Sequence, residues 1–321
     1  MRPCNPRFAA GAVRRGARTC SPRPIMRNGG MTDVRFLDHL VLPVTDLSTA
    51  RARLTRLGFS VAADGRHPFG TGNACVFLPD GIYLEPLAVV SHVETEAAMR
   101  AGNQFVARDS AFRFRNGAEG LSAIVMATPD ADADHAAFRA AGLSAGDQLS
   151  FSRVMKFPDG SEIQPSFRLS FAADLRAPDF FAFTCQRVNM PPVDRSAVER
   201  HANGAVGVAR AVLSEQEPGA FPDYLRLMTS GEAHVTEAGG LSVPAANAVI
   251  DVLAPVTLKA EFGLTRSSER GLRGEAVVFK VVDLAAAERL LAENNVRHLR
   301  SGGMVLVPRE PGQGTLFAFS E

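Results

Sequence analysis

The sequence predicts an α+β protein in which four βαβββ units pair into two curved-sheet modules. A segment with the length and apolar spacing of a helix, flanked by strand-like runs, recurs along the chain. One such unit is too small to bury its own sheet, so the units are expected to pair. The length of 321 residues also exceeds what one hydrophobic core usually organises, which favours two modules.

The first unit shows the pattern most clearly. A strand rich in Val and Leu at 36–44 precedes a helix expected to begin at Asp46 and to end at Gly58. Asp is a favoured N-cap residue and Gly a favoured residue just past a helix end. The short apolar runs that follow predict strands at 59–63, 73–79 and 82–90.

The other three units repeat this order. The second follows a helical connector at 94–109 and has a strand at 120–130, a helix at 131–143 and strands at 149–160, 161–171 and 179–188. The third has a strand at 205–214, a helix at 221–231 and strands at 233–239, 240–245 and 247–255. A linker at 258–273 leads to the fourth, with a strand at 275–284, a helix at 285–295 and strands at 296–300, 302–310 and 315–321.

Composition divides the chain into an extension, two modules and a linker. Residues 1–32 are expected to be a disordered Arg-rich extension, 33–190 the N-terminal module, 191–204 a Pro-rich linker and 205–321 a degenerate C-terminal module that supports the first. The extension is similar in composition to a transit peptide. We favour instead an extension that precedes a working start at Met26 or Met31.

Charge and apolar content exclude several classes of protein. The first thirty residues hold seven arginines and no acidic residue, which leaves 28 basic against 34 acidic residues in the rest. That balance argues against a nucleic-acid-binding body. No apolar run reaches the roughly 18 residues that cross a bilayer, so no membrane partner is expected. The four cysteines lack paired spacing, which favours reduced thiols and a cytoplasmic location.

Two polar residues stand in otherwise apolar strands of the first unit. His39 lies in the first strand and Glu85 in the last. Alternate residues of a strand share a face, so Leu37, His39 and Val41 are expected to point together, as are Tyr83, Glu85 and Leu87. A buried carboxylate needs a charge partner or a metal, because its desolvation is costly. Both residues nevertheless have simpler interpretations as satisfied polar groups in a core.

Five stretches resemble landmarks of the vicinal oxygen chelate superfamily and, within it, of the uncharacterised glyoxalase-like domain family. They are LDHLVLPV, HPFGTGN, YLEPLAV, FTCQ and HANGA. The resemblance implies paired βαβββ units of the glyoxalase/bleomycin-resistance/dioxygenase type that enclose a metal and a small-molecule ligand. It places the metal ligands at His39 and Glu85, with Glu85 also the candidate catalytic residue. Zn, Fe, Mn or Ni would suit this pair.

The second unit departs from the superfamily pattern. Ala123 or Ser122 stands where a histidine ligand would be wanted, and Cys185, Gln186 and Arg187 lie opposite the place of Glu85. A dioxygenase is therefore less expected than a lyase or isomerase. Candidate substrate-binding residues are Arg187, which suits an anionic group, together with Gln186, His67, Thr71, Asn73 and His201.

Two functions stay open from the sequence. The first is a metal-dependent lyase or isomerase acting on an oxygenated carbonyl or vicinal-oxygen substrate. The alternative is a metal-free protein that sequesters a small molecule, with Glu85 paired to Arg187. The sequence also leaves open whether the chain forms a homodimer.

Overall fold

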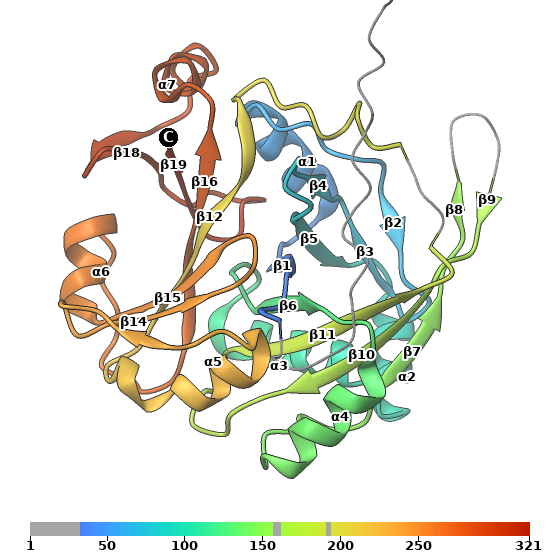
Figure 1. Ribbon diagram of the computed structural model, residues 1–321. Coiled ribbons are helices and arrows are strands. Elements are labelled where there is room, and N and C mark those ends of the chain that lie inside the picture. The colour runs from blue at the N-terminus through green and yellow to red at the C-terminus, as the bar shows by residue number, and fades with distance from the viewer. Residues whose placement is uncertain (1–32, 157–161, 191–193) are drawn as a thin grey trace, which may run out of the picture. The chain divides into compact units, whose positions relative to one another are not determined.

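Two large mixed β-sheets organise the chain, as Figure 1 shows for this computed structural model. The structure describes residues 33–156, 162–190 and 194–321, of which Asp33–Glu321 form one compact unit. The predicted extension at 1–32 and part of the predicted linker lie outside the described residues. None of the helices in the described ranges has both the length and the apolar character that crossing a bilayer requires.

The first sheet comes from the first two units. Its strand order is β2-β3-β5-β1-β6-β11-β10-β7, and β4 pairs with β5. The strands are β1 (Leu37–Pro43), β2 (Gly65–Arg66), β3 (Thr71–Asn73), β4 (Val76–Phe77), β5 (Tyr83–Val89), β6 (Ala123–Ala127), β7 (Leu149–Ser152), β10 (Ser166–Ala172) and β11 (Phe181–Val188). A separate hairpin consists of β8 (Met155–Lys156) and β9 (Glu162–Ile163).

The second sheet comes from the last two units and has the same plan. Its order is β13-β14-β15-β12-β16-β19-β18-β17. The strands are β12 (Ala205–Ser214), β13 (His234–Val235), β14 (Leu241–Pro244), β15 (Val249–Leu253), β16 (Arg273–Val281), β17 (Leu299–Ser301), β18 (Met304–Val307) and β19 (Leu316–Ser320). Four paired units in two mixed curved sheets confirm the predicted fold class.

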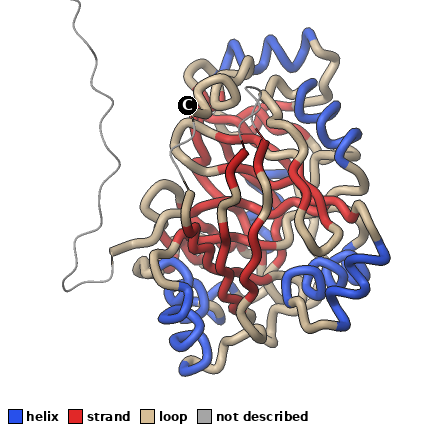
Figure 2. Tube along the Cα trace, turned by 90° about the vertical axis from the view of Figure 1, so that its right-hand side faces the viewer, coloured by secondary structure: helices blue, strands red, loops and turns tan. Residues whose placement is uncertain are grey.

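The helices lie around the strands, as Figure 2 shows. They are α1 (Leu47–Arg56), α2 (His92–Arg100), α3 (Gln104–Asn116), α4 (Ala131–Ala140), the 3₁₀ turn η1 (Pro218–Ala220), α5 (Pro222–Thr229), α6 (Pro255–Phe262) and α7 (Leu284–Glu293). The side chain of Asp46 accepts a hydrogen bond from the Thr49 N–H, 2.8 Å, and caps α1 as predicted. Gly58 follows the helix with a φ of 85°, which suits a glycine.

Two local predictions were wrong, and a third was right in kind but not in extent. Residues 59–63 run without a strand ladder, because the Ser60 N–H donates to His201 Nδ1 and the Ala62 N–H to the Cys75 carbonyl. The connector at 94–109 is helical as predicted, but it is longer and consists of the two helices α2 and α3, between which Gly102 has a φ of 86°. The linker predicted at 258–273 begins inside α6, where Leu258 and Phe262 are one turn apart and bury against the second sheet.

One hydrophobic core joins residues of both sheets. It includes Leu40 and Phe59 from the first half of the described chain and Val208, Phe279 and Phe319 from the second. The opposite face of each sheet has a smaller core of its own. The candidate site lies on that opposite face of the first sheet.

Candidate functional site

A bulge in β1 sets the direction of His39. Leu37 pairs with Met126 and His39 with Val125, so Asp38 is an extra residue without a partner on β6. Such a bulge changes which face the following side chains occupy. Leu37 therefore packs in the shared core while Val41 lies on the opposite face, and the prediction that Leu37 and His39 point together was wrong.

His39 is held from its Nδ1 side by Asp38. The two side chains are both 4% exposed, and His39 Nδ1 lies 2.7 Å from Asp38 Oδ1. Because a carboxylate only accepts hydrogen bonds, Nδ1 is the donor. In the neutral imidazole this leaves the Nε2 lone pair free, and Nε2 lies 3.5 Å from Oε2 of Glu85.

Arg187 pairs with Asp38 and not with Glu85. Its Nη2 donates to Asp38 Oδ1 at 2.6 Å, and its guanidinium lies over the Tyr83 ring at 5.8 Å. Burial alone would raise the pKa of Asp38, but the charge of Arg187 and the hydrogen bond from His39 bring it below its usual value. Asp38 is thus an anion that links Arg187 to His39.

Glu85 is the acidic centre of the cluster. It is 4% exposed, and its Oε1 accepts a hydrogen bond from Asn73 Nδ2 at 2.7 Å. Tyr83, Glu85 and Leu87 share a face of β5, as predicted, because Leu87 packs in the core of that face and Tyr83 stacks on His39 with ring centroids 4.4 Å apart. The sequence reasoning missed both Asp38 and Tyr83, although each lies within two residues of a residue it had selected.

The loop before β3 brings a second histidine to Glu85. His67 Nε2 lies 3.7 Å from Glu85 Oε1, and its Nδ1 lies 2.9 Å from the Thr71 hydroxyl. Burial, followed by the charge of Arg153 and the proximity of His39, lowers the pKa of His67 to about 3, so its ring is neutral near pH 7. The structure thus brings His67, Thr71 and Asn73 together with His39 and Glu85.

A cavity of about 30 Å³ lies among these polar groups. Its walls are largely aromatic, with Phe69, Phe105, Phe151, Phe167, Phe183 and Tyr83 beside Cys185. That volume holds one or two water molecules or an ion, and it is far below the size of a pocket for a drug-like molecule.

The second unit contributes mainly apolar side chains to this face, together with the basic side chains of Arg153 and Arg187. When Ala123 is aligned with His39, strand pairing places Phe183 at the position of Glu85. Among the described residues, no three or more His, Cys, Asp or Glu side chains are already arranged to hold a metal ion. The closest approaches of His39 and His67 to Glu85 are to different carboxylate oxygens.

The structure does not bring Gln186 or His201 to the cluster. Gln186 Nε2 donates to the Pro129 carbonyl and its Oε1 accepts from the Ala131 N–H, so it fixes the start of α4. His201 accepts from the Ser60 N–H at Nδ1 and donates to the Phe77 carbonyl from Nε2, 2.9 Å. Both side chains have clear structural partners.

The second sheet carries an ion pair at the corresponding positions. The bulge recurs in β12, where Ala209 is the extra residue, and pairing then matches Arg210 to His39 and Asp251 to Glu85. Arg210 Nε donates to Asp251 Oδ2 at 2.6 Å, and its Nη1 donates to Glu261 of α6 at 3.0 Å. The C-terminal module therefore fills this place with a salt bridge.

Sequence comparison places the chain in a family. A family profile described as a glyoxalase-like domain matches residues 37–226, which is more than half of the chain and covers all the residues of the cluster. The chain belongs to the glyoxalase-like domain family. A search of curated proteins gave no match.

Solved structures share the fold of this family member at low sequence identity. A hypothetical protein from Staphylococcus aureus has a TM-score of 0.59 at 10% identity, over 89% of this chain and 99% of that one. A mutant 4-hydroxymandelate synthase from Streptomyces coelicolor has a TM-score of 0.57 at 12% identity, over 89% and 92%. A Mn(II)-bound glyoxalase from Novosphingobium aromaticivorans has a TM-score of 0.51 at 10% identity, over 89% and 81%. Two of them are members of the vicinal oxygen chelate superfamily.

Proposed function

We propose that this glyoxalase-like protein binds a divalent metal at His39, His67 and Glu85 and acts on a small oxygenated carbonyl compound as a lyase or isomerase. One observation carries the proposal. Two buried imidazoles direct their Nε2 atoms at one buried carboxylate, at 3.5 and 3.7 Å, across a cavity of about 30 Å³.

The chemistry of these side chains fits a metal. Ligating histidines typically donate their other ring N–H to a carboxylate or another oxygen, which fixes the ring. Asp38 and Thr71 stand in those places, at 2.7 and 2.9 Å from the Nδ1 atoms. Two ligands of one ion at about 2.1 Å lie about 3–3.4 Å apart, so the observed separations need only a small contraction. Two histidines and one carboxylate would leave coordination positions for a substrate.

The residues around the cavity suit a small carbonyl substrate. A bound divalent metal would act as a Lewis acid toward a carbonyl oxygen. The carboxylate of Glu85 could take a proton from the carbon beside that carbonyl, and the Asn73 N–H would keep the carboxylate in place. The largely aromatic walls limit the contact of the cavity with bulk water, while Arg187, 26% exposed, could receive an anionic end of the substrate. Because the cavity is small, a substrate would have to displace side chains that now fill it.

The first experiment is elemental analysis of the purified full chain after reconstitution with Mn, Fe, Ni or Zn. We expect about one metal per chain, and at least a tenfold weaker affinity in His39→Ala, His67→Ala and Glu85→Ala, because each removes a ligand. His234→Ala is the control, since His234 is exposed on β13 in the second sheet. Equal metal content in His234→Ala and Glu85→Ala would refute the site.

The metal-free alternative makes a different prediction. The aromatic lining, and the lack of a preformed set of three ligands among the described residues, favour a protein that only sequesters an aromatic molecule. The sequence-based version of this alternative paired Glu85 with Arg187. That pairing is wrong, because Arg187 pairs with Asp38. A reconstituted chain that stays free of metal would support this second function.

A further inference from the structure

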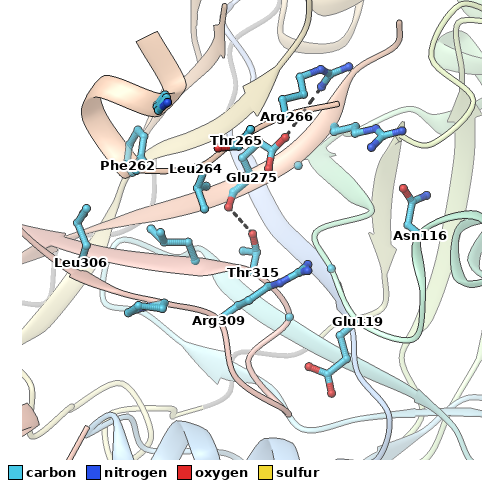
Figure 3. A pocket seen from close by; sticks show the side chains of 18 of the residues that line it. Asn116, Glu119, Phe262, Leu264, Thr265, Arg266, Glu275, Leu306, Arg309 and Thr315 are labelled. Atoms are coloured by element: carbon cyan, nitrogen blue, oxygen red, sulfur yellow. Dashed lines mark hydrogen bonds and ion pairs between the residues drawn. The ribbon is translucent and has the colours of Figure 1, made fainter. Parts of the chain in front are cut away.

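The C-terminal module borders a second and larger pocket. It has a volume of about 700 Å³ and lies between the end of α3 and the face of the second sheet that α6 covers (Figure 3). A pocket of this size is typical of small-molecule sites. It shares no lining residue with the cavity at His39 and Glu85.

The acidic side chains that line this pocket all have partners, whereas some of the basic ones do not. Five basic and three acidic side chains line it, namely Arg115, Lys259, Arg266, Arg273, Arg309, Glu119, Asp179 and Glu275. Every acid has a partner within the protein. Asp179 pairs with Arg115 and with Arg273, Glu119 accepts from the Gly312 N–H at 2.9 Å, and Glu275 accepts from the Ser214 hydroxyl at 2.5 Å.

Two of the five basic side chains, Lys259 and Arg309, have no close acidic partner. Neither Lys259 nor Arg309 makes a side-chain hydrogen bond or a close ion pair with another described residue, although the charge of Arg309 acts on the Glu275 carboxyl group, and both side chains are exposed. Figure 3 shows the Arg309 side chain extending into the pocket. Arg273, which reaches the same space, keeps a buried Nε atom without a partner among the described residues. The pocket therefore presents unpaired positive charge to whatever enters it.

The rest of the wall is apolar. Phe262, Leu264, Leu306 and Leu316 form part of the lining. Phe262, Leu306 and Leu316 are already buried and Leu264 is partly buried, so the size of the pocket, and not exposed apolar area, favours an organic ligand. An inorganic ion would fill little of a volume of about 700 Å³, whereas a ring-sized body attached to an anionic group would fill more of it. A guanidinium beside such a wall is well suited to a carboxylate or phosphate attached to that body.

We propose that this pocket is a second ligand site, for a small organic anion that joins a ring-sized apolar body to a carboxylate or phosphate. The charges of Arg309 and Lys259 attract the anionic head, and the body lies against the side of the pocket that Phe262, Leu264 and Leu306 line. The site is independent of the metal proposed at Glu85.

Binding of simple aryl anions to the full chain tests this proposal. Phenyl phosphate and phenylacetate, followed by calorimetry and ligand-observed NMR, are expected to bind with a Kd below about 1 mM, and the tighter of the two identifies the head group. Benzylamine, of similar size and opposite charge, is expected not to bind. The variant Glu85→Ala should bind both anions as the wild type does, which separates this site from the one proposed above.

The decisive variant is Arg309→Gln combined with Lys259→Gln. Both side chains are exposed and make no ion pair with described residues, so the fold should be unaffected. We expect the Kd for the better anion to rise at least about tenfold, as for the loss of charged hydrogen bonds. Arg139→Gln, an exposed arginine on α4, is the control and should change nothing. Equal weakening by Arg139→Gln, unchanged binding in the double variant, or benzylamine binding as tightly as the anions would overturn the proposal.

Discussion

At the scale of single residues, the candidate site depends on how His39 is oriented. Its ring receives contacts on three sides: Asp38 at Nδ1, Tyr83 on the ring face and the edge of Phe183 at a centroid distance of 5.7 Å. These contacts restrict ring rotation, so Nε2 stays directed toward Glu85.

Replacing Asp38 tests this orientation directly. Asp38→Asn removes the negative charge that fixes the Nδ1–H of His39 and that pairs with Arg187. We expect metal affinity to fall about 10- to 100-fold, the usual effect of losing such a partner, with the fold retained. Isothermal titration with the bound metal, together with ring ¹⁵N shifts of His39, measures both effects. Asp174→Asn is the matched control, because Asp174 is equally buried and pairs with Arg176. Equal metal affinity in both variants would mean that Asp38 has only a structural role.

What the sequence could predict at this scale follows from strand periodicity. The pattern selected His39 and Glu85, because a polar residue in an apolar strand stands out. It did not show Asp38 as a partner, since alternation places neighbours on opposite faces and only the bulge overrides this. The roles of Gln186 and His201 depend on contacts with Pro129 and Phe77, far away in the sequence.

At the scale of elements, capping residues in the sequence predicted where a helix begins and ends. The sequence did not reveal a short helix that forms because it packs against a sheet. Asp46 and Gly58 marked both ends of α1. α6 was missed because a helix of 8 residues that begins at Pro255 resembles a strand end followed by a linker. Its formation depends on the second sheet, since Leu258 and Phe262 pack there and Glu261 joins the ion pair of Arg210 and Asp251.

The cap of α1 gives a prediction about pH. Hydrogen bonds from the Ser48 hydroxyl and from Thr49 lower the pKa of Asp46 to about 2, from 3.8. A carboxyl group with a lowered pKa stabilises the folded state above its unfolded value and loses this contribution as the pH falls. We therefore expect the stability advantage of the wild type over Asp46→Asn to decline between about pH 4 and pH 2, because Asn does not titrate. Urea unfolding at several pH values measures it, and a difference that is constant with pH would contradict the prediction.

At the scale of the whole described chain, the two sheets share a hydrophobic core. The sequence did not show which faces of the sheets form it. The sequence indicated four units and their pairing, and the sheets bear this out. It could not indicate which apolar face meets which, because both faces of β1 and of β12 carry buried residues. The shared core includes Phe59, whose ring lies 5.1 Å from that of Phe279 and 6.1 Å from that of Phe319.

Phe59 should therefore contribute to the stability of both halves at once. Phe59→Ala removes a ring that is 3% exposed and leaves a cavity between residues of the two sheets. We expect a loss of about 3–5 kcal/mol in the free energy of unfolding, in a single cooperative transition, since both sheets border the cavity. Phe114→Ala is the matched control, because Phe114 is 92% exposed and should cost less than about 0.5 kcal/mol. Two separate transitions, of which only the first shifts, would mean that the modules fold independently despite their common core.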